Sequence, residues 1–312
     1  MLVLKRAKQR ILISLMCAFI AVPAIGRELV IAIEGTLQVS TSLDAMARSQ
    51  MLVRNLKMAE VPQAMFLIRT ESMGAKNRER VALYSNQGHL LVNAGHDHSL
   101  VTKSDLYAYE VSILKANRLL RPYSGYKKHL HFSYLNETGD PLIQRGLIDF
   151  LNERGYKPAF TGFNPARGID TYVDQLYQAR LRANRRVDMA GLEKAYIQLM
   201  MKPLEQQDAY LFNMLGYSPR QVLVVQENDL AAYFIVGLVD ELAARGWKMI
   251  AAEKALNDPI VNPMALSGWG ANSHLRGITG LPDQGLAYPR LIGLRKAEVD
   301  HVLNQFVPGF TE

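Results

Sequence analysis

Residues 88–100 read Gly-His-Leu-Leu-Val-Asn-Ala-Gly-His-Asp-His-Ser-Leu, and this stretch decides the fold. It opens with a glycine able to end a helix, continues as a short apolar strand, and closes on a His-Asp-His cluster. Parallel α/β folds place their functional side chains at the carboxyl ends of buried strands. The stretch therefore predicts one strand of a parallel sheet, with a polar site where that strand ends.

The joint that opens this stretch occurs at three places in the chain. A helix, a glycine, a ring-bearing residue and a strand follow one another at residues 86–90, 153–157 and 244–248. Apolar runs that suit buried strands alternate with helical patterns, at residues 29–33, 64–68, 89–93, 128–134, 158–163, 221–226 and 248–252. We therefore expect an α/β fold of about seven parallel strands, either a barrel or a doubly wound sheet.

The composition fits a globular protein with a large core. The chain has 312 residues, of which 49% are hydrophobic, enough for one domain of barrel size or two smaller ones. The net charge of +7 is moderately basic. A solvated surface of Lys and Arg accounts for this charge without an anionic partner, so no nucleic-acid partner is predicted.

The first residues have the pattern of an export signal. Basic residues precede an apolar run at residues 11–22, and small residues follow at Ala24 and Gly26. This order predicts a signal peptide over residues 1–26. An uncleaved anchor is the alternative, although the run is short for a membrane-spanning helix. The single cysteine, Cys17, lies inside the run, so the mature chain would lack thiols. We expect a secreted, periplasmic protein with no stable membrane span after cleavage.

Two His-x-His pairs stand at the ends of predicted strands. His96 and His98 lie in the stretch quoted above, and His129 and His131 belong to the next strand. Residues i and i+2 of an extended chain point to the same side, so each pair can offer two nitrogens to one metal ion. The spacing fixes no third ligand. Zinc is therefore expected only if the histidines converge, and otherwise no cofactor is expected.

Polar residues also follow the other strands. Glu34 ends the first strand, Asn164 and Asp170 follow the fifth, and Gln226 ends the sixth. The carboxyl ends of parallel strands meet at one edge of the sheet, so these residues are candidates for the same site.

Five segments share their order and spacing with a known family. They are the strand at residues 29–35, the joint at 61–66, the strand entry at 87–93, the loop Tyr-Leu-Asn-Glu-Thr-Gly-Asp at 134–140, and the segment 221–259. Together they resemble the polysaccharide deacetylase family, which has the NodB-homology fold. The resemblance covers roughly residues 28–260 and implies a deformed parallel (β/α) barrel, with a C-terminal extension at residues 261–312 packed on it.

Members of this family remove N- or O-acetyl groups from glycans with the help of a metal ion, often zinc. One aspartate and two histidines hold the metal, a second aspartate is the general base, and a late histidine is the general acid. Such a metal polarises the acetyl carbonyl and activates a water molecule. The resemblance thus implies a site of this kind at the strand ends.

The metal-binding positions of the family are mostly substituted in this chain. Gly35 stands at the position of the metal aspartate, and Ala94 at that of the first histidine. The second histidine is matched by His98. Glycine and alanine side chains offer no ligand atom, and one imidazole alone binds a metal weakly.

The catalytic positions are also changed. The base position holds Glu34, the arginine of the family falls on His131, and the late acid falls on Gln226. Asp170 is a further catalytic candidate. Tyr134, Asn164 and Trp269 are candidates for binding the glycan, since an exposed indole can stack on a sugar ring.

Three hypotheses follow from these substitutions. The favoured one is a catalytically inactive relative, a pseudoenzyme, that binds an acetylated polysaccharide or peptidoglycan-like glycan. The second is an active metal-dependent hydrolase in which His96, His98 and His131, with Glu34 or Asp97, form a displaced ligand set. The third is a non-enzymatic protein that docks other envelope proteins through its barrel.

Overall fold

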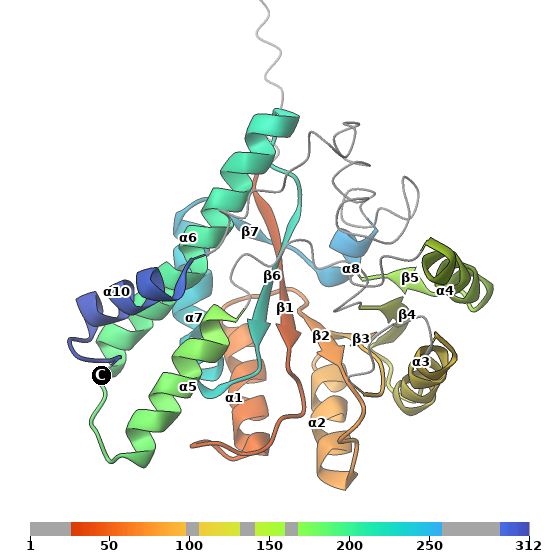
Figure 1. The fold of residues 1–312 in the computed structure, drawn as a ribbon, viewed down its shortest axis with the longest axis horizontal. Helices are drawn as coiled ribbons and strands as arrows, with labels where there is room; N and C mark the ends of the chain where they lie inside the picture. The colour runs from red at the N-terminus through yellow and green to blue at the C-terminus, as the bar shows by residue number, and fades with distance from the viewer. Residues whose placement is uncertain (1–25, 98–105, 132–140, 160–167, 258–293, 312) are drawn as a thin grey trace, which may run out of the picture.

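The computed structural model describes residues 26–97, 106–131, 141–159, 168–257 and 294–311 (Figure 1). Seven strands form one sheet in the order β5-β4-β3-β2-β1-β6, and β7 pairs with the start of β1. All of their pairings are parallel. The strands are β1 (Glu28–Glu34), β2 (Met65–Ile68), β3 (Leu90–Asn93), β4 (Tyr126–Leu130), β5 (Lys157–Pro158), β6 (Gln221–Gln226) and β7 (Lys248–Met249).

Helices alternate with these strands along the chain. They are α1 (Ala45–Met58), α2 (Ala75–Asn86), α3 (Leu106–Leu120), α4 (Pro141–Glu153), α5 (Ile169–Arg182), α6 (Met189–Leu215), α7 (Asp229–Ala244), α8 (Ala252–Leu256) and α10 (Lys296–Phe306). The predicted parallel α/β fold of about seven strands is confirmed. The edge strands of this order are β5 and β6, and within the described residues no pairing joins these two strands.

Some predicted boundaries move by a few residues. The strand predicted at 128–134 is β4, which already ends at Leu130, and the last predicted strand ends at Met249 because α8 begins at Ala252. Of the strand predicted at 158–163, residues 160–163 lie outside the description. The described strand at this place is β5, Lys157–Pro158.

Strand β1 is central because it is apolar on both faces. Leu29, Ile31 and Ile33 belong to the large core that the sheet shares with α1, α6 and α7. Val30 and Ala32 point the other way, into a second core between strands. Burial on both faces explains why the strand appears in the sequence as a continuous apolar run without alternation.

The three glycine joints have the predicted geometry. Gly88, Gly155 and Gly246 have φ angles of 83°, 69° and 83°, in the left-handed region that favours glycine. The ring that follows each glycine is buried. One of these rings, His89, accepts a hydrogen bond from the Ala64 N–H at Nδ1 (3.2 Å), and burial lowers its pKa to about 4. This neutral imidazole is a packing residue of the joint.

The described C-terminal segment packs on the helical layer. Val299, Val302 and Leu303 of α10 join the large core. Arg180 of α5 donates to the Phe310 carbonyl (2.9 Å), and its guanidinium lies 5.1 Å from the Phe310 ring centre. Arg180 thus ties the described C-terminal segment to α5.

The predicted export signal falls almost wholly on residues outside the description. Among the helices that the structure describes, none combines the length and the apolar character needed to cross a membrane.

Candidate functional site

The last residues of β1 and β6 lie side by side at the carboxyl edge of the sheet. The two strands run in register along their whole length, which pairs Glu34 with Gln226 (Figure 1). The Gln226 carboxamide donates from Nε2 to Glu34 Oε2 at 3.0 Å. The Glu34 side chain is 27% exposed, so a solute can reach this carboxylate.

His131, the residue after β4, also lies near the Glu34 carboxylate. Its backbone N–H donates to the Asn93 carbonyl (2.8 Å), and Nδ1 lies 3.4 Å from the Ala159 carbonyl oxygen. This leaves Nε2 3.8 Å from Glu34 Oε1, a separation that becomes an ion pair when the imidazole is protonated. Because β2 and β3 stand between β1 and β4, this contact requires a strongly curled sheet.

Asp170 holds the backbone at the end of β6. This buried residue of the first turn of α5 accepts the backbone N–H of Gln226 at Oδ2 (2.6 Å) and that of Thr171 at Oδ1 (2.8 Å). Burial raises the pKa of Asp170 to about 7, against the lowering effect of these two N–H groups, and the charge of Glu34 raises it further. Asp170 therefore fixes the end of β6 while holding a proton for part of the time near neutral pH.

His96 and Asp97 belong to a neighbouring group of contacts. His96 Nδ1 lies 2.9 Å from Thr70 Oγ1, and the His96 backbone N–H donates to Ser112 Oγ (2.8 Å). The Ser112 hydroxyl in turn donates to Asp97 Oδ1 (3.1 Å). Burial, followed by the charge of Lys115, lowers the pKa of His96.

The other predicted site residues cannot be placed. His98, Tyr134, Asn164 and Trp269 lie outside the described residues. In the part of the chain that the structure describes, no group of three or more His, Cys, Asp and Glu side chains comes together as a metal site. The displaced ligand set, which needs His98, stays a prediction.

The described residues around Gly35 do not fit the metal site that the resemblance implies. Gly35 has a φ of +64°, and a Cβ added to it would overlap Gln226 Oε1 and lie 2.7 Å from Gln38 Nε2. An aspartate at this position would therefore have to push aside the end of the Gln226 side chain and adopt a φ that is strained for residues other than glycine. Gly35 offers no ligand atom, and the Gln226 carboxamide lies where the Cβ of an aspartate would stand.

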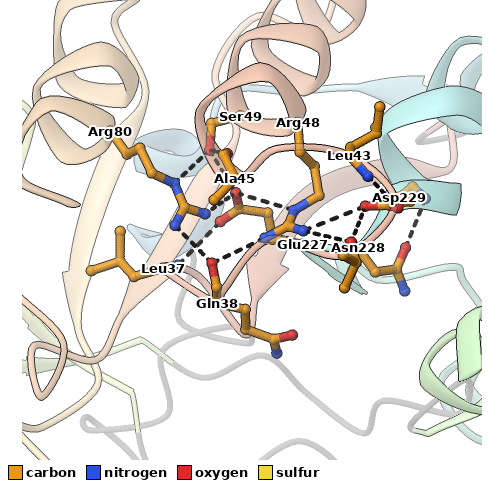
Figure 2. Close-up of polar contacts among 12 residues, drawn as sticks. Leu37, Gln38, Leu43, Ala45, Arg48, Ser49, Arg80, Glu227, Asn228 and Asp229 are labelled. Carbon is orange, nitrogen blue, oxygen red and sulfur yellow. Dashed lines mark hydrogen bonds and ion pairs between the residues drawn. The ribbon is translucent and has the colours of Figure 1, made fainter. Parts of the chain in front are cut away.

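A buried ionic network directly beneath the site was missed by sequence reasoning (Figure 2). Glu227 follows Gln226 and is 0% exposed. Its Oε1 atom accepts from Arg80 Nη2 (2.5 Å), Ser49 Oγ (2.7 Å) and the Tyr84 hydroxyl (3.0 Å). A second buried pair joins Arg48 Nη1 to Asp229 Oδ1 at 3.4 Å.

The network holds the loop between β1 and α1. Arg48 and Arg80 both donate to the Gln38 carbonyl, at 3.1 and 2.9 Å, and Arg48 also donates to the Val39 carbonyl. The Leu37 N–H donates to Glu227 Oε2 at 3.3 Å. A sequence signal existed, because Arg48 and Arg80 each stand four residues before a residue of the buried helix face.

Several solved structures of deacetylases and esterases are similar to this chain at low sequence identity. The catalytic domain of a peptidoglycan N-acetylglucosamine deacetylase from Eubacterium rectale has a TM-score of 0.48 at 11% identity, over 72% of this chain and 88% of that one. A peptidoglycan deacetylase from Bacillus subtilis has a TM-score of 0.47 at 10% identity, over 75% and 91%.

A family 4 acetyl xylan esterase from Clostridium thermocellum, solved with cobalt, has a TM-score of 0.45 at 14% identity, over 76% of this chain and 95% of that one. At TM-scores below 0.5 these similarities carry no weight for activity or substrate. No protein-family model and no curated protein matches the sequence.

Proposed function

We propose that this protein binds an acetylated glycan at the carboxyl edge of its sheet without the metal-dependent deacetylation of the family it resembles. The observation that carries the proposal is the place of the Gln226 side chain, which fills the space that a metal aspartate at position 35 would need. An aspartate at position 35 would have to displace this side-chain end and adopt a φ of +64°.

The polar groups at this edge suit a sugar. Glu34 offers carboxylate oxygens, Gln226 and Gln38 offer carboxamides, and none of the three is fully buried. Carboxylates and carboxamides bind hydroxyl and amide groups through directed hydrogen bonds. The edge is also where parallel α/β folds bind their ligands.

Calorimetry of the full chain with partially acetylated chito-oligosaccharides tests the proposal. We expect saturable binding in EDTA, metal-free protein after exposure to excess zinc, and no release of acetate. Glu34→Gln should weaken binding, whereas Glu79→Gln, at an exposed position of α2, should not. Near-stoichiometric zinc that disappears in His98→Ala, or acetate release abolished by Glu34→Gln, would overturn the proposal.

An active hydrolase with a rearranged site is the second candidate. The short approach of His131 Nε2 to Glu34 Oε1, at 3.8 Å, favours it because a carboxylate and an imidazole are common acid–base partners. Acetate release from acetylated glycans, measured with and without zinc or cobalt, tests this candidate. Activity that is lost in both Glu34→Gln and His131→Ala would establish it.

The location and domain division belong to the same proposal. We place a cleaved signal at residues 1–26, the barrel at 27–260 and an extension at 261–312, with the periplasm as the destination. Fractionation of expressing cells and N-terminal sequencing of the exported chain test this. A chain that starts between Ala24 and Arg27 is the expected result, and full-length protein in the cytoplasm would contradict it.

A further inference from the structure

The C-terminal end of α6 projects beyond the sheet. Asp208 still contacts the start of β6, because its Oδ1 atom accepts from Gln221 Nε2 at 2.7 Å. The helix then continues over residues 209–215, a further rise of about 10 Å (Figure 1). The apolar side chains of this last part form a cluster of their own, apart from the other cores: Tyr210, Leu211, Met214 and Leu215.

This end of the helix is uncharged and partly exposed. The sequence has no charged residue between Asp208 and Arg220. Phe212 is 52% exposed, although phenylalanine usually lies inside a protein, and Met214 and Leu215 are half-buried. An exposed apolar cluster without charges is typical of a surface that contacts a membrane or another protein.

The place where the chain enters the fold favours the membrane. Arg27 precedes β1, and its Nε atom lies 2.8 Å from Asp208 Oδ2, so the last turns of α6 lie beside this entry point. The apolar run at residues 11–22 ends four residues before Gly26, and four residues span at most about 14 Å. While that run lies in a membrane, before cleavage or as an anchor, the end of α6 stays within reach of the bilayer surface.

We propose that the end of α6, residues 210–215, is a membrane-contact surface that inserts shallowly into the headgroup region of a phospholipid bilayer. Phe212 supplies apolar contact, and the ring of Tyr210 suits the boundary between lipid and water. One short apolar patch gives weak, reversible attachment rather than a membrane span. Strands β1 and β6 run away from this surface, so the edge that carries Glu34 and Gln226 faces away from the membrane (Figure 1). The inference goes beyond the proposed glycan binding and does not depend on it.

Tryptophan substitutions in the full chain test which end of the molecule meets lipid. Phe212→Trp places an indole at the proposed surface. Tyr107→Trp places one at a 79% exposed position in the first turn of α3, whose Ser112 accepts from the His96 N–H beyond the carboxyl end of β3. Vesicles of phosphatidylcholine and phosphatidylglycerol with brominated acyl chains quench an indole that inserts among them. We expect about a twofold loss of the added fluorescence for Phe212→Trp and no loss for Tyr107→Trp. Equal quenching at both positions, or none at position 212, would overturn the proposal.

Vesicle flotation measures what the surface itself contributes. The cleaved, exported chain retains every described helix and strand, and we expect it to float with the same vesicles. The double variant Phe212→Ser, Met214→Ser should bind them about tenfold more weakly, because two apolar side chains no longer enter the bilayer. The control variant Tyr107→Ser, Val111→Ser removes two exposed apolar side chains of α3 and should bind as the wild type does. Thermal melts should show all variants folded.

The other outcomes separate a lipid surface from other occupants. A wild type that does not float, or a double variant that floats equally well, would overturn the membrane contact. A wild-type dimer that the double variant splits would also overturn it and assign the surface to a second copy. Chito-oligosaccharides should bind the wild type and the double variant equally, so failure of the membrane contact leaves the proposed glycan binding untouched.

Discussion

Gln226 and Glu227 are neighbours in sequence, yet they belong to regions of opposite character. Gln226 lies at an accessible edge and shares one hydrogen bond with the partly exposed Glu34 carboxylate. Glu227 is fully buried and is surrounded by a guanidinium and two hydroxyl groups. Successive residues of an extended chain point to opposite faces, so the side chain of Gln226 lies at the proposed binding edge and that of Glu227 in the buried network. The two regions should therefore respond very differently to substitution.

Breaking the buried network should have the largest effect. Arg80→Met leaves Glu227 buried without its strongest partner, so we expect the free energy of unfolding to fall by about 3–5 kcal/mol. Urea denaturation followed by circular dichroism measures the change. The double variant Arg80→Met, Glu227→Met removes both charges and should regain much of the loss. A single variant as stable as the wild type would show that the pair contributes nothing.

Restoring the family's aspartate should be the next most damaging change. Gly35→Asp places a Cβ against Gln226 Oε1 and puts a non-glycine residue at a φ of +64°, so we expect a loss of about 3 kcal/mol. The double variant Gly35→Asp, Gln226→Ala should recover the part of the lost unfolding free energy that is due to the overlap, as measured by the same urea titrations. Tolerance of Gly35→Asp alone would mean that Gln226 moves aside freely.

The pH dependence of stability should reveal the ionisation of Asp174, a buried carboxyl group next to the network. Burial raises the pKa of Asp174 to about 6, with the charge of Asp229 adding to the effect. The folded state thus binds the proton more tightly than the unfolded state, and stability is lost as pH rises from about 4 to 6. Asp174 Oδ1 has no hydrogen-bond partner among the described residues. The amide nitrogen of an asparagine can therefore replace this oxygen without the loss of a hydrogen bond.

Asp174→Asn should therefore leave stability near pH 4 unchanged and raise the free energy of unfolding at pH 8 by about 3 kcal/mol. Melting temperatures from pH 4 to 8 measure this difference in slope. Asp149→Asn, on the exposed face of α4, should run parallel to the wild type. Parallel curves for Asp174→Asn as well would show that Asp174 ionises normally.

The accessible region was easier to predict from sequence than the buried one. Apolar runs such as residues 29–33 and the glycine joints are local signals, so strands, helices and the edge that carries Glu34 and Gln226 could be predicted. The network could not, because Arg48 and Arg80 come from separate helices and meet Glu227 only through the fold. A helical arginine beside apolar residues usually extends to solvent. The overlap between Gly35 and Gln226 is likewise a long-range fact of packing.

Substitutions at the accessible edge should have the smallest effect on stability and their main effect on binding. Glu34→Gln keeps an oxygen that can accept from Gln226 Nε2, and the side chain is partly exposed, so we expect the free energy of unfolding to change by less than about 0.5 kcal/mol. The same variant should weaken glycan binding, because a carboxylate accepts stronger hydrogen bonds than a carboxamide. Urea titration and calorimetry on one preparation measure both quantities. A large loss of stability in Glu34→Gln would mean that this edge, like the network beneath it, holds the fold together.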